Sequence, residues 1–355
     1  EATFAKLAME LVGDTRQANL LEQLDLMIPG SKAALVDRII GVAGNLAKKS
    51  VDPEKVIRRM IAEGLDTAGD VAGAAAKVAP DTIPVPKGKA GALPANFERA
   101  TGLSPADSAV EAKAFEKIMS KEREILDAYK KKFGNVVNTD NFRPFFAEEG
   151  YVGSNSAAVQ EPSSYLRKKA WAEGLQRPGE DAVLYAGGSG TGKTSAIKNI
   201  PELAEKTRKA AVVLDGNLSA SDSAAKAVSQ AELAGKKAPV IYVYRDPVES
   251  FVEGVVKRMN DNPEEMGRLV PSKEVAGNHI GSWDVVRKLK EKGKSVIFVD
   301  NSLGQKNAKI VPFEDLNKKI NYPSKEELTS MFNAKAKELL DAGKITPEQY
   351  RGYIN

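Results

Sequence analysis

An eight-residue stretch, Gly187–Thr194, restricts the fold of this chain more than any other feature of its sequence. Its order, Gly-Gly-Ser-Gly-Thr-Gly-Lys-Thr, fits the Gly-x-x-x-x-Gly-Lys-Thr phosphate-loop pattern. An apolar run precedes it at residues 182–186 and a helical pattern follows it, which is the context that the pattern needs in order to bind phosphate. We therefore expect a strand, a phosphate loop and a helix in this order.

Short apolar runs separated by helical stretches continue after this loop. Each run is rich in Val, Ile or Tyr and is apolar on both faces, which is typical of strands in a parallel sheet covered by helices. The predicted strands are residues 182–186, 210–214, 240–244 and 296–299. The sequence thus predicts a doubly wound α/β fold, a P-loop three-layer sandwich with a parallel sheet.

Length and proline content predict two domains. At 355 residues the chain exceeds the size at which one hydrophobic core usually stops growing. The first part has apolar positions at helical spacing and is expected to be all-α, and four prolines from Pro80 to Pro94 then indicate a linker. The expected parts are a helical domain at 1–79, a linker at 80–103 and a P-loop domain at 104–355, with its core at 181–305 and C-terminal helices at 324–355.

Helix start and stop signals occur at several places in the P-loop domain. Ser104 and Pro105 predict the start of a helix, and Gly134 predicts its end. Further helices are expected at residues 163–173, 324–342 and 346–353.

Composition excludes several kinds of chemistry. The chain has no cysteine and one histidine, His279, which removes thiolate metal sites and most zinc sites. Lys and Arg number 52 against 48 Asp and Glu, a mixed surface that argues against nucleic acid as a partner. No stretch is long and apolar enough for a membrane span, so we expect a cytoplasmic protein with no membrane partner.

The glycines of the loop favour phosphate binding because they let successive backbone N–H groups turn toward phosphate oxygens. Lys193 can reach the outer phosphates of a nucleoside triphosphate, and Thr194 can be a ligand of Mg²⁺. The predicted nucleotide-binding residues are Gly187, Gly188, Ser189, Gly190, Thr191, Gly192, Lys193, Thr194 and Ser195.

Asp215 ends the next predicted strand, close to the loop, at the sheet edge where ligands bind in open α/β folds. A carboxylate there can accept the proton of an attacking hydroxyl, which makes Asp215 the candidate general base. Two other interpretations stay open: Asp215 caps the following turn, or it holds a metal ion through water.

Asp300 ends another predicted strand and distinguishes two classes of enzyme. If Asp300 and Thr194 hold the metal without an activated nucleophile, the chain is a hydrolytic NTPase; if Asp215 faces an acceptor hydroxyl, it is a kinase.

Residues 245–281 contain arginines among residues typical of loops, and we expect them to form a mobile lid whose guanidinium groups fold over the phosphates.

Several of these runs together resemble the kinase domain of the zeta toxins, in the variant found in polyvalent proteins of phages and mobile elements. The resemblance covers about residues 105–305. The runs that carry it are Gly187–Ser195, Leu214–Leu218, Tyr242–Pro247, Gly267–Pro271 with His279, and Val299–Ser302, together with the upstream segments Val137–Asp140 and Gln160–Ser163.

The resemblance implies a kinase related to polynucleotide kinases that uses ATP and Mg²⁺ to phosphorylate a hydroxyl of a nucleotide sugar, nucleotide or dinucleotide, with toxin activity. Carried over by position, Lys193 and Thr194 bind phosphate and metal, Asp215 is the general base, and Arg258 and Arg268 come from the lid. The resemblance also implies an antitoxin or virion partner and a bacterial host cytoplasm, reached from a virion.

Two alternatives to this function stay open at the level of sequence. The first is a polynucleotide 5′-kinase or a plain ATPase. The second is a structural component of a phage or mobile element that carries the kinase domain as a passenger.

Overall fold

The computed structural model describes residues 97–261 and 267–354. The predicted helical domain at 1–79 and most of the predicted linker at 80–103 lie outside the described residues. The chain divides into two compact units, and the unit that carries the phosphate loop consists of residues 99–224 and 236–355. The following description concerns this unit.

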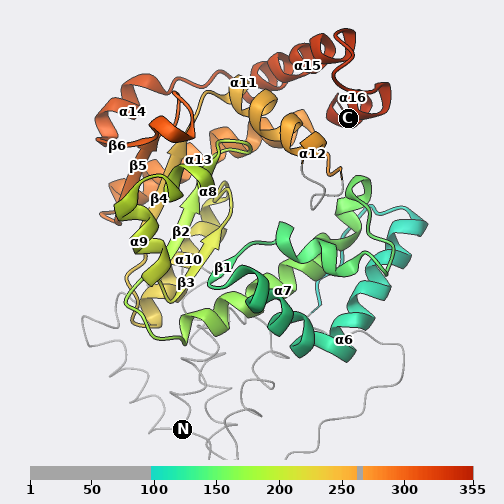
Figure 1. Ribbon diagram of the computed structural model, residues 1–355, viewed down its shortest axis with the longest axis horizontal. Coiled ribbons are helices and arrows are strands. Elements are labelled where there is room, and N and C mark those ends of the chain that lie inside the picture. Colours follow the sequence, from blue (N-terminus) through green and yellow to red (C-terminus); the bar gives the residue numbers. More distant parts are fainter. Residues whose placement is uncertain (1–96, 262–266, 355) are drawn as a thin grey trace, which may run out of the picture. The chain divides into compact units, whose positions relative to one another are not determined.

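A six-stranded sheet with the order β1-β3-β2-β4-β5-β6 forms the centre of the unit (Figure 1). The first five strands pair in parallel, and β6 pairs with β5 in antiparallel orientation. The sheet is therefore mostly parallel, as predicted, with one antiparallel strand at its edge. The strands are β1 (Val136–Val137), β2 (Ala182–Ala186), β3 (Val212–Asp215), β4 (Val240–Tyr244), β5 (Val296–Asp300) and β6 (Lys309–Val311).

Strand β2 lies between the two strands that follow it along the chain, with β3 on one side and β4 on the other. All five of its residues are buried, because the sheet is covered on both faces. After β2 the chain first adds β3 on one side of it and then β4 on the other, so the order of the strands reverses at β2. Ligands of open α/β folds bind at such a point, outside the carboxyl ends of the strands. The phosphate loop follows β2 directly.

Helices cover both faces of the sheet and make the predicted three layers. On one face, Ile197 and Leu203 pack against Val183, Ile241 and other strand residues. On the other face, the ring of Trp283 contacts Tyr242 and Phe298. The helices of this unit are α6 (Pro105–Phe133), α7 (Gln160–Leu175), α8 (Lys193–Lys198), α9 (Pro201–Lys209), α11 (Pro247–Glu249), α12 (Lys257–Asp261), α13 (Ser272–Glu291), α14 (Phe313–Lys319), α15 (Lys325–Asp341) and α16 (Pro347–Ile354). Most of helix α10 (Ser221–Leu233) belongs to the other unit.

The helix boundaries inferred from capping residues are confirmed. Helix α6 begins at Pro105, its N-cap Ser104 accepts a hydrogen bond from the N–H of Asp107, and Gly134 ends it with a φ of 66°. Helix α15 begins after Ser324 with a capping box to Glu327. No helix in the described part of the chain combines the length and the apolar composition that a bilayer crossing needs.

The described residues of the expected lid, 245–281, are mostly helical, which corrects their expected loop character, while the lid itself stays a prediction. Helix α11, the π-helical segment η3 (Ser250–Val256) and α12 follow one another without a break, and α13 begins at Ser272. Phe251 and Val275 of this region belong to a hydrophobic core shared with α15 and α16. Of the described residues in this stretch, those from 267 to 271 form the link between the two helical parts.

Candidate active site

The phosphate loop has the backbone shape that its glycines allow. Gly187, Gly190 and Gly192 have φ values of 140°, 78° and 73°, a region that side chains with a Cβ rarely adopt. Gly192 is the N-cap of α8, which begins at Lys193. The first N–H groups of a helix have no partner within the helix, so those of α8 are available to an anion, and their binding of phosphate stays a prediction.

The loop is packed tightly against the π-helical segment η3. A Cβ on Gly190 would lie 2.1 Å from the carbonyl oxygen of Ser250, and one on Gly254 would lie 2.2 Å from the carbonyl oxygen of Gly190. Neither residue can carry a side chain without movement of backbone. Segments of π-helix are rare and often occur at functional sites, and here the segment fixes the position of the loop.

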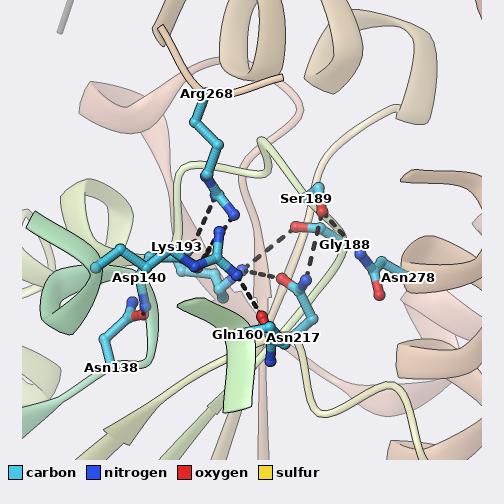
Figure 2. A network of polar contacts seen from close by, with 10 residues as sticks. Asn138, Asp140, Gln160, Gly188, Ser189, Lys193, Asn217, Arg268 and Asn278 are labelled. Atoms are coloured by element: carbon cyan, nitrogen blue, oxygen red, sulfur yellow. Dashed lines mark hydrogen bonds and ion pairs between the residues drawn. The ribbon is translucent and has the colours of Figure 1, made fainter. Parts of the chain in front are cut away.

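A network of amide side chains holds the tip of the loop (Figure 2). The hydroxyl of Ser189 accepts hydrogen bonds from Asn278 Nδ2 at 3.0 Å and Asn217 Nδ2 at 3.3 Å. The backbone carbonyl of Asn217 accepts from the N–H of Gly187 and from the hydroxyl of Ser282. Residues after β3 and on α13 thus fix the first part of the glycine-rich stretch, from Gly187 to Ser189.

His279 of α13 is a buried support of the loop. Its Nε2 donates to the carbonyl oxygen of Ser189 at 3.0 Å, and a Cβ on Gly188 would lie 2.3 Å from its ring. Burial lowers the pKa of His279 to about 4, and the charge of Lys193 adds to this shift, while the bond to Ser189 and the charge of Asp246 oppose it. His279 is therefore a neutral hydrogen-bond donor.

This arrangement predicts a loss of stability in acid. An unfolded histidine has a pKa of about 6.5, so between about 6.5 and about 4 the unfolded chain binds a proton that the native protein does not. The free energy of unfolding should fall by roughly 3 kcal/mol across this range because of His279. His279 is the sole histidine of the sequence, so one NMR signal measures its native pKa.

The control is His279→Gln, which keeps an N–H donor but does not titrate, and which should remove this part of the pH dependence. A native signal that titrates between pH 6 and 7 would contradict the buried neutral state.

The side chain of Lys193 lies within the phosphate loop, where the sequence predicts that it binds phosphate. Its Nζ donates to the carbonyl oxygens of Gly187 and Gly188 and, at 3.0 Å, to Asn217 Oδ1. Burial lowers the pKa of Lys193 to about 8, although the charge of Asp215 opposes the shift. The ammonium group is held at the mouth of the loop by oxygen acceptors, where it can interact with an anion.

Asp215 contacts the end of the phosphate loop that leads into helix α8. Its Oδ2 accepts a hydrogen bond from Thr194 Oγ1 at 3.3 Å, and the side chain of Asn138 also hydrogen-bonds the carboxylate. Burial raises the pKa of Asp215 above its usual value, while the charge of Lys193 and these two hydrogen bonds act in the opposite direction. A carboxylate with a raised pKa is a better proton acceptor than an ordinary one.

The two predicted arginines both act on Asp140. Arg268 forms a two-point ion pair with Asp140, with NH1 to Oδ1 at 3.0 Å and NH2 to Oδ2 at 2.7 Å. Arg258 on α12 acts electrostatically on Asp140 and on Lys193. Sequence reasoning did not assign a role to Asp140, which belongs to the short helix η1 (Asp140–Phe146) long before the loop.

Asp300 does not reach the phosphate loop. Its Oδ2 accepts from Lys319 Nζ at 2.7 Å and its Oδ1 from the N–H of Ser302. The neighbouring Asn301 makes the contact instead, since its Nδ2 donates to the carbonyl of Thr191 at 2.7 Å. These contacts do not favour the alternative in which Asp300 and Thr194 share a metal ion.

A divalent cation fits at the hydroxyl of Thr194. This hydroxyl is exposed and lies beside the carboxylate of Asp215, and it is an oxygen ligand of the kind that Mg²⁺ prefers. Within residues 97–261 and 267–354 no group of three or more acidic or histidine side chains is arranged as a metal site. An Mg²⁺ ion here would thus take most of its ligands from phosphate and water.

The comparison with protein families bears on the residues after the phosphate loop. Residues 202–313 match the Zeta toxin family. This zeta-toxin-like region is 112 of the 355 residues and contains Asp215, Arg258 and Arg268. It begins after the phosphate loop, so the loop and the family match are separate observations. Zeta toxins are a P-loop kinase-like family, which agrees with a phosphate loop that precedes the matched residues in the chain.

The comparisons with solved structures and with curated proteins carry no argument about function. A solved structure from a study of the PezAT chromosomal toxin–antitoxin system of Streptococcus pneumoniae is 14% identical and covers 47% of this chain and 88% of its own, with a TM-score of 0.27. Such a TM-score is too low to support an inference. No curated protein matches the chain.

Proposed function

We propose that this chain is an ATP-dependent kinase that transfers the γ-phosphate of ATP to a hydroxyl of a nucleotide, dinucleotide or nucleotide sugar. The observation that carries the proposal is the contact between Asp215 and Thr194, 3.3 Å apart, because it joins a candidate base to the phosphate loop. The zeta-toxin-like region, which contains Asp215, supports a phosphotransferase.

In this proposal each side chain has a separate task. The glycine N–H groups and Lys193 bind the β- and γ-phosphates, and Thr194 binds Mg²⁺, which neutralises phosphate charge when it is present. Asp215 accepts the proton of the acceptor hydroxyl as its oxygen attacks the γ-phosphorus. Arg268 and Arg258 stabilise the charge of the transferred group, and ADP leaves.

The acceptor class separates this proposal from its alternatives. ADP release should be measured with ATP and Mg²⁺ alone, with pools of nucleotides or nucleotide sugars, and with DNA carrying free 5′-hydroxyl ends. Small nucleotide-based acceptors should raise the rate at least tenfold over hydrolysis, because an activated alcohol replaces water as the attacking group. A rate that is the same without any acceptor would indicate a plain ATPase, and stimulation by DNA ends alone would indicate a polynucleotide 5′-kinase.

The antitoxin or virion partner stays a prediction.

A further inference from the structure

The turn that follows β1, residues 138–140, lies against the catalytic carboxylate. The side chain of Asn138 hydrogen-bonds Asp215. The turn itself is fixed, because the N–H of Asn138 donates to the hydroxyl of Tyr129 at 2.9 Å and Asn138 Oδ1 accepts from the N–H of Asp140 at 2.8 Å. Tyr129 in turn stacks on Phe142, so the turn is anchored in the core.

The same turn holds Arg268 at a sequence separation of 128 residues. Both guanidinium NH groups donate to the carboxylate of Asp140, and the Arg268 side chain is only 10% exposed. A two-point contact of this kind fixes the plane of a guanidinium as well as its position. Figure 2 shows Asp140 between Arg268 and Asn138, with Lys193 in the same network of residues.

The carboxylate of Asp140 also supplies the negative charge that balances a group of neighbouring cationic side chains. Burial alone would raise its pKa, but the charges of Arg268, Arg143, Arg258 and Lys193 hold the pKa of Asp140 below its ordinary value. Arg143 is itself buried and donates to Gln160, so it cannot move away. Without the carboxylate, the cations would repel one another and Arg268 would lose its fixed orientation.

We propose that Asp140 is a positioning residue that orients Arg268 toward the phosphoryl group held by the phosphate loop. The role follows from the place of the ion pair: it lies beside Lys193, at the phosphate site. It makes a segment before the loop, outside the zeta-toxin-like region, part of the catalytic machinery. The inference rests on the proposed function for the identity of the transferred group.

The test is a titration that needs no acceptor. Calorimetry should compare binding of ADP with Mg²⁺, and of ADP with Mg²⁺ and aluminium fluoride, which imitates the phosphoryl group in transfer. Asp140→Asn should weaken binding of the aluminium fluoride complex by about 10- to 100-fold, the size of effect that a misplaced catalytic group produces. Binding of ADP with Mg²⁺ in the absence of aluminium fluoride should change little.

A double-variant cycle shows whether Asp140 acts through Arg268. Arg268→Ala should cause a similar loss, and the double variant should lose no more than either single one, since both changes remove the same interaction. The matched control is Asp127→Asn, which breaks the exposed ion pair of Asp127 with Arg123 on α6 and should change neither affinity. Asp140→Glu should recover part of the lost affinity.

Several results would overturn the proposal: unchanged affinity of Asp140→Asn for the aluminium fluoride complex, an equal loss for ADP alone, or losses that multiply in the double variant. If Asp140→Asn does not fold, Arg268→Lys tests the same pair, because lysine keeps the charge but not the two-point contact. Wild-type protein that binds the complex but transfers no phosphate would refute the proposed function and leave this titration valid. Wild-type protein that does not bind ADP with Mg²⁺ would refute both.

Discussion

Replacing Asp215 with Asn is expected to lower the rate of phosphoryl transfer by about 10²- to 10⁴-fold, the usual contribution of a general base. Asparagine has nearly the same shape and can keep a hydrogen bond with Thr194, but it cannot take a proton from the acceptor. The affinity for ATP with Mg²⁺ should change little, because Lys193 and the loop remain. Initial rates under saturating ATP and calorimetry of ATP binding measure the two quantities separately.

The control for this change is Asp315→Asn, which alters an exposed carboxylate in the first turn of α14. It should leave both the rate and the ATP affinity near those of the wild-type protein. An Asp215→Asn variant that binds ATP and still transfers phosphate at the wild-type rate would show that Asp215 is not the base.

Replacing Gly254 with Ala should weaken ATP binding by about 5- to 150-fold. The new Cβ would lie 2.2 Å from the carbonyl oxygen and 2.4 Å from the Cα of Gly190, so the phosphate loop has to move. Overpacking of this kind costs about 1–3 kcal/mol, and here the cost falls on the shape of the binding loop. Calorimetry with ATP and Mg²⁺ measures the effect.

Gly277→Ala is the matched control, since Gly277 is also a helical glycine, in α13. Its Cβ would meet the mobile end of the Lys325 side chain at 3.2 Å, and alanine is the better helix former, so stability should be unchanged or slightly raised. Equal ATP affinities for the two variants would mean that the contact between η3 and the loop does not shape the phosphate site.

The strands that line the site could be predicted because each is apolar on both faces. The predicted ranges 182–186 and 240–244 coincide with β2 and β4, and 296–299 falls one residue short of β5. Strand β6 was missed because it is an edge strand with Lys309 and Ile310 exposed. Strand β1 was missed because two residues carry no periodicity.

The region expected to be a lid shows why composition misleads near a binding loop. Gly254 and Gly277 are typical of loops, yet both lie in helices. Gly254 is there because the backbone of Gly190 comes so close that a side chain does not fit. A glycine required for close approach and a glycine required for flexibility look the same in a single sequence.

Local patterns predicted the phosphate loop and a carboxylate at the adjacent strand end, and the structure brings Thr194 and Asp215 into contact. The roles of Lys193, Thr194, Asp215, Arg258 and Arg268 stay predictions. The contribution of Asp140 was not found in this way. Its partner Arg268 is 128 residues distant, and the resemblance, whose runs include both residues, implies a role for Arg268 but none for Asp140.

Mass spectrometry with ATP that carries heavy oxygen in its γ-phosphate tests the central claim most directly. The protein is incubated with this ATP, Mg²⁺ and an extract of small metabolites, next to the Asp215→Asn variant. The account predicts that a nucleotide-based metabolite gains one heavy phosphate with the wild-type protein and none with the variant. Heavy oxygen recovered only in inorganic phosphate, at the same rate in both samples, would contradict it.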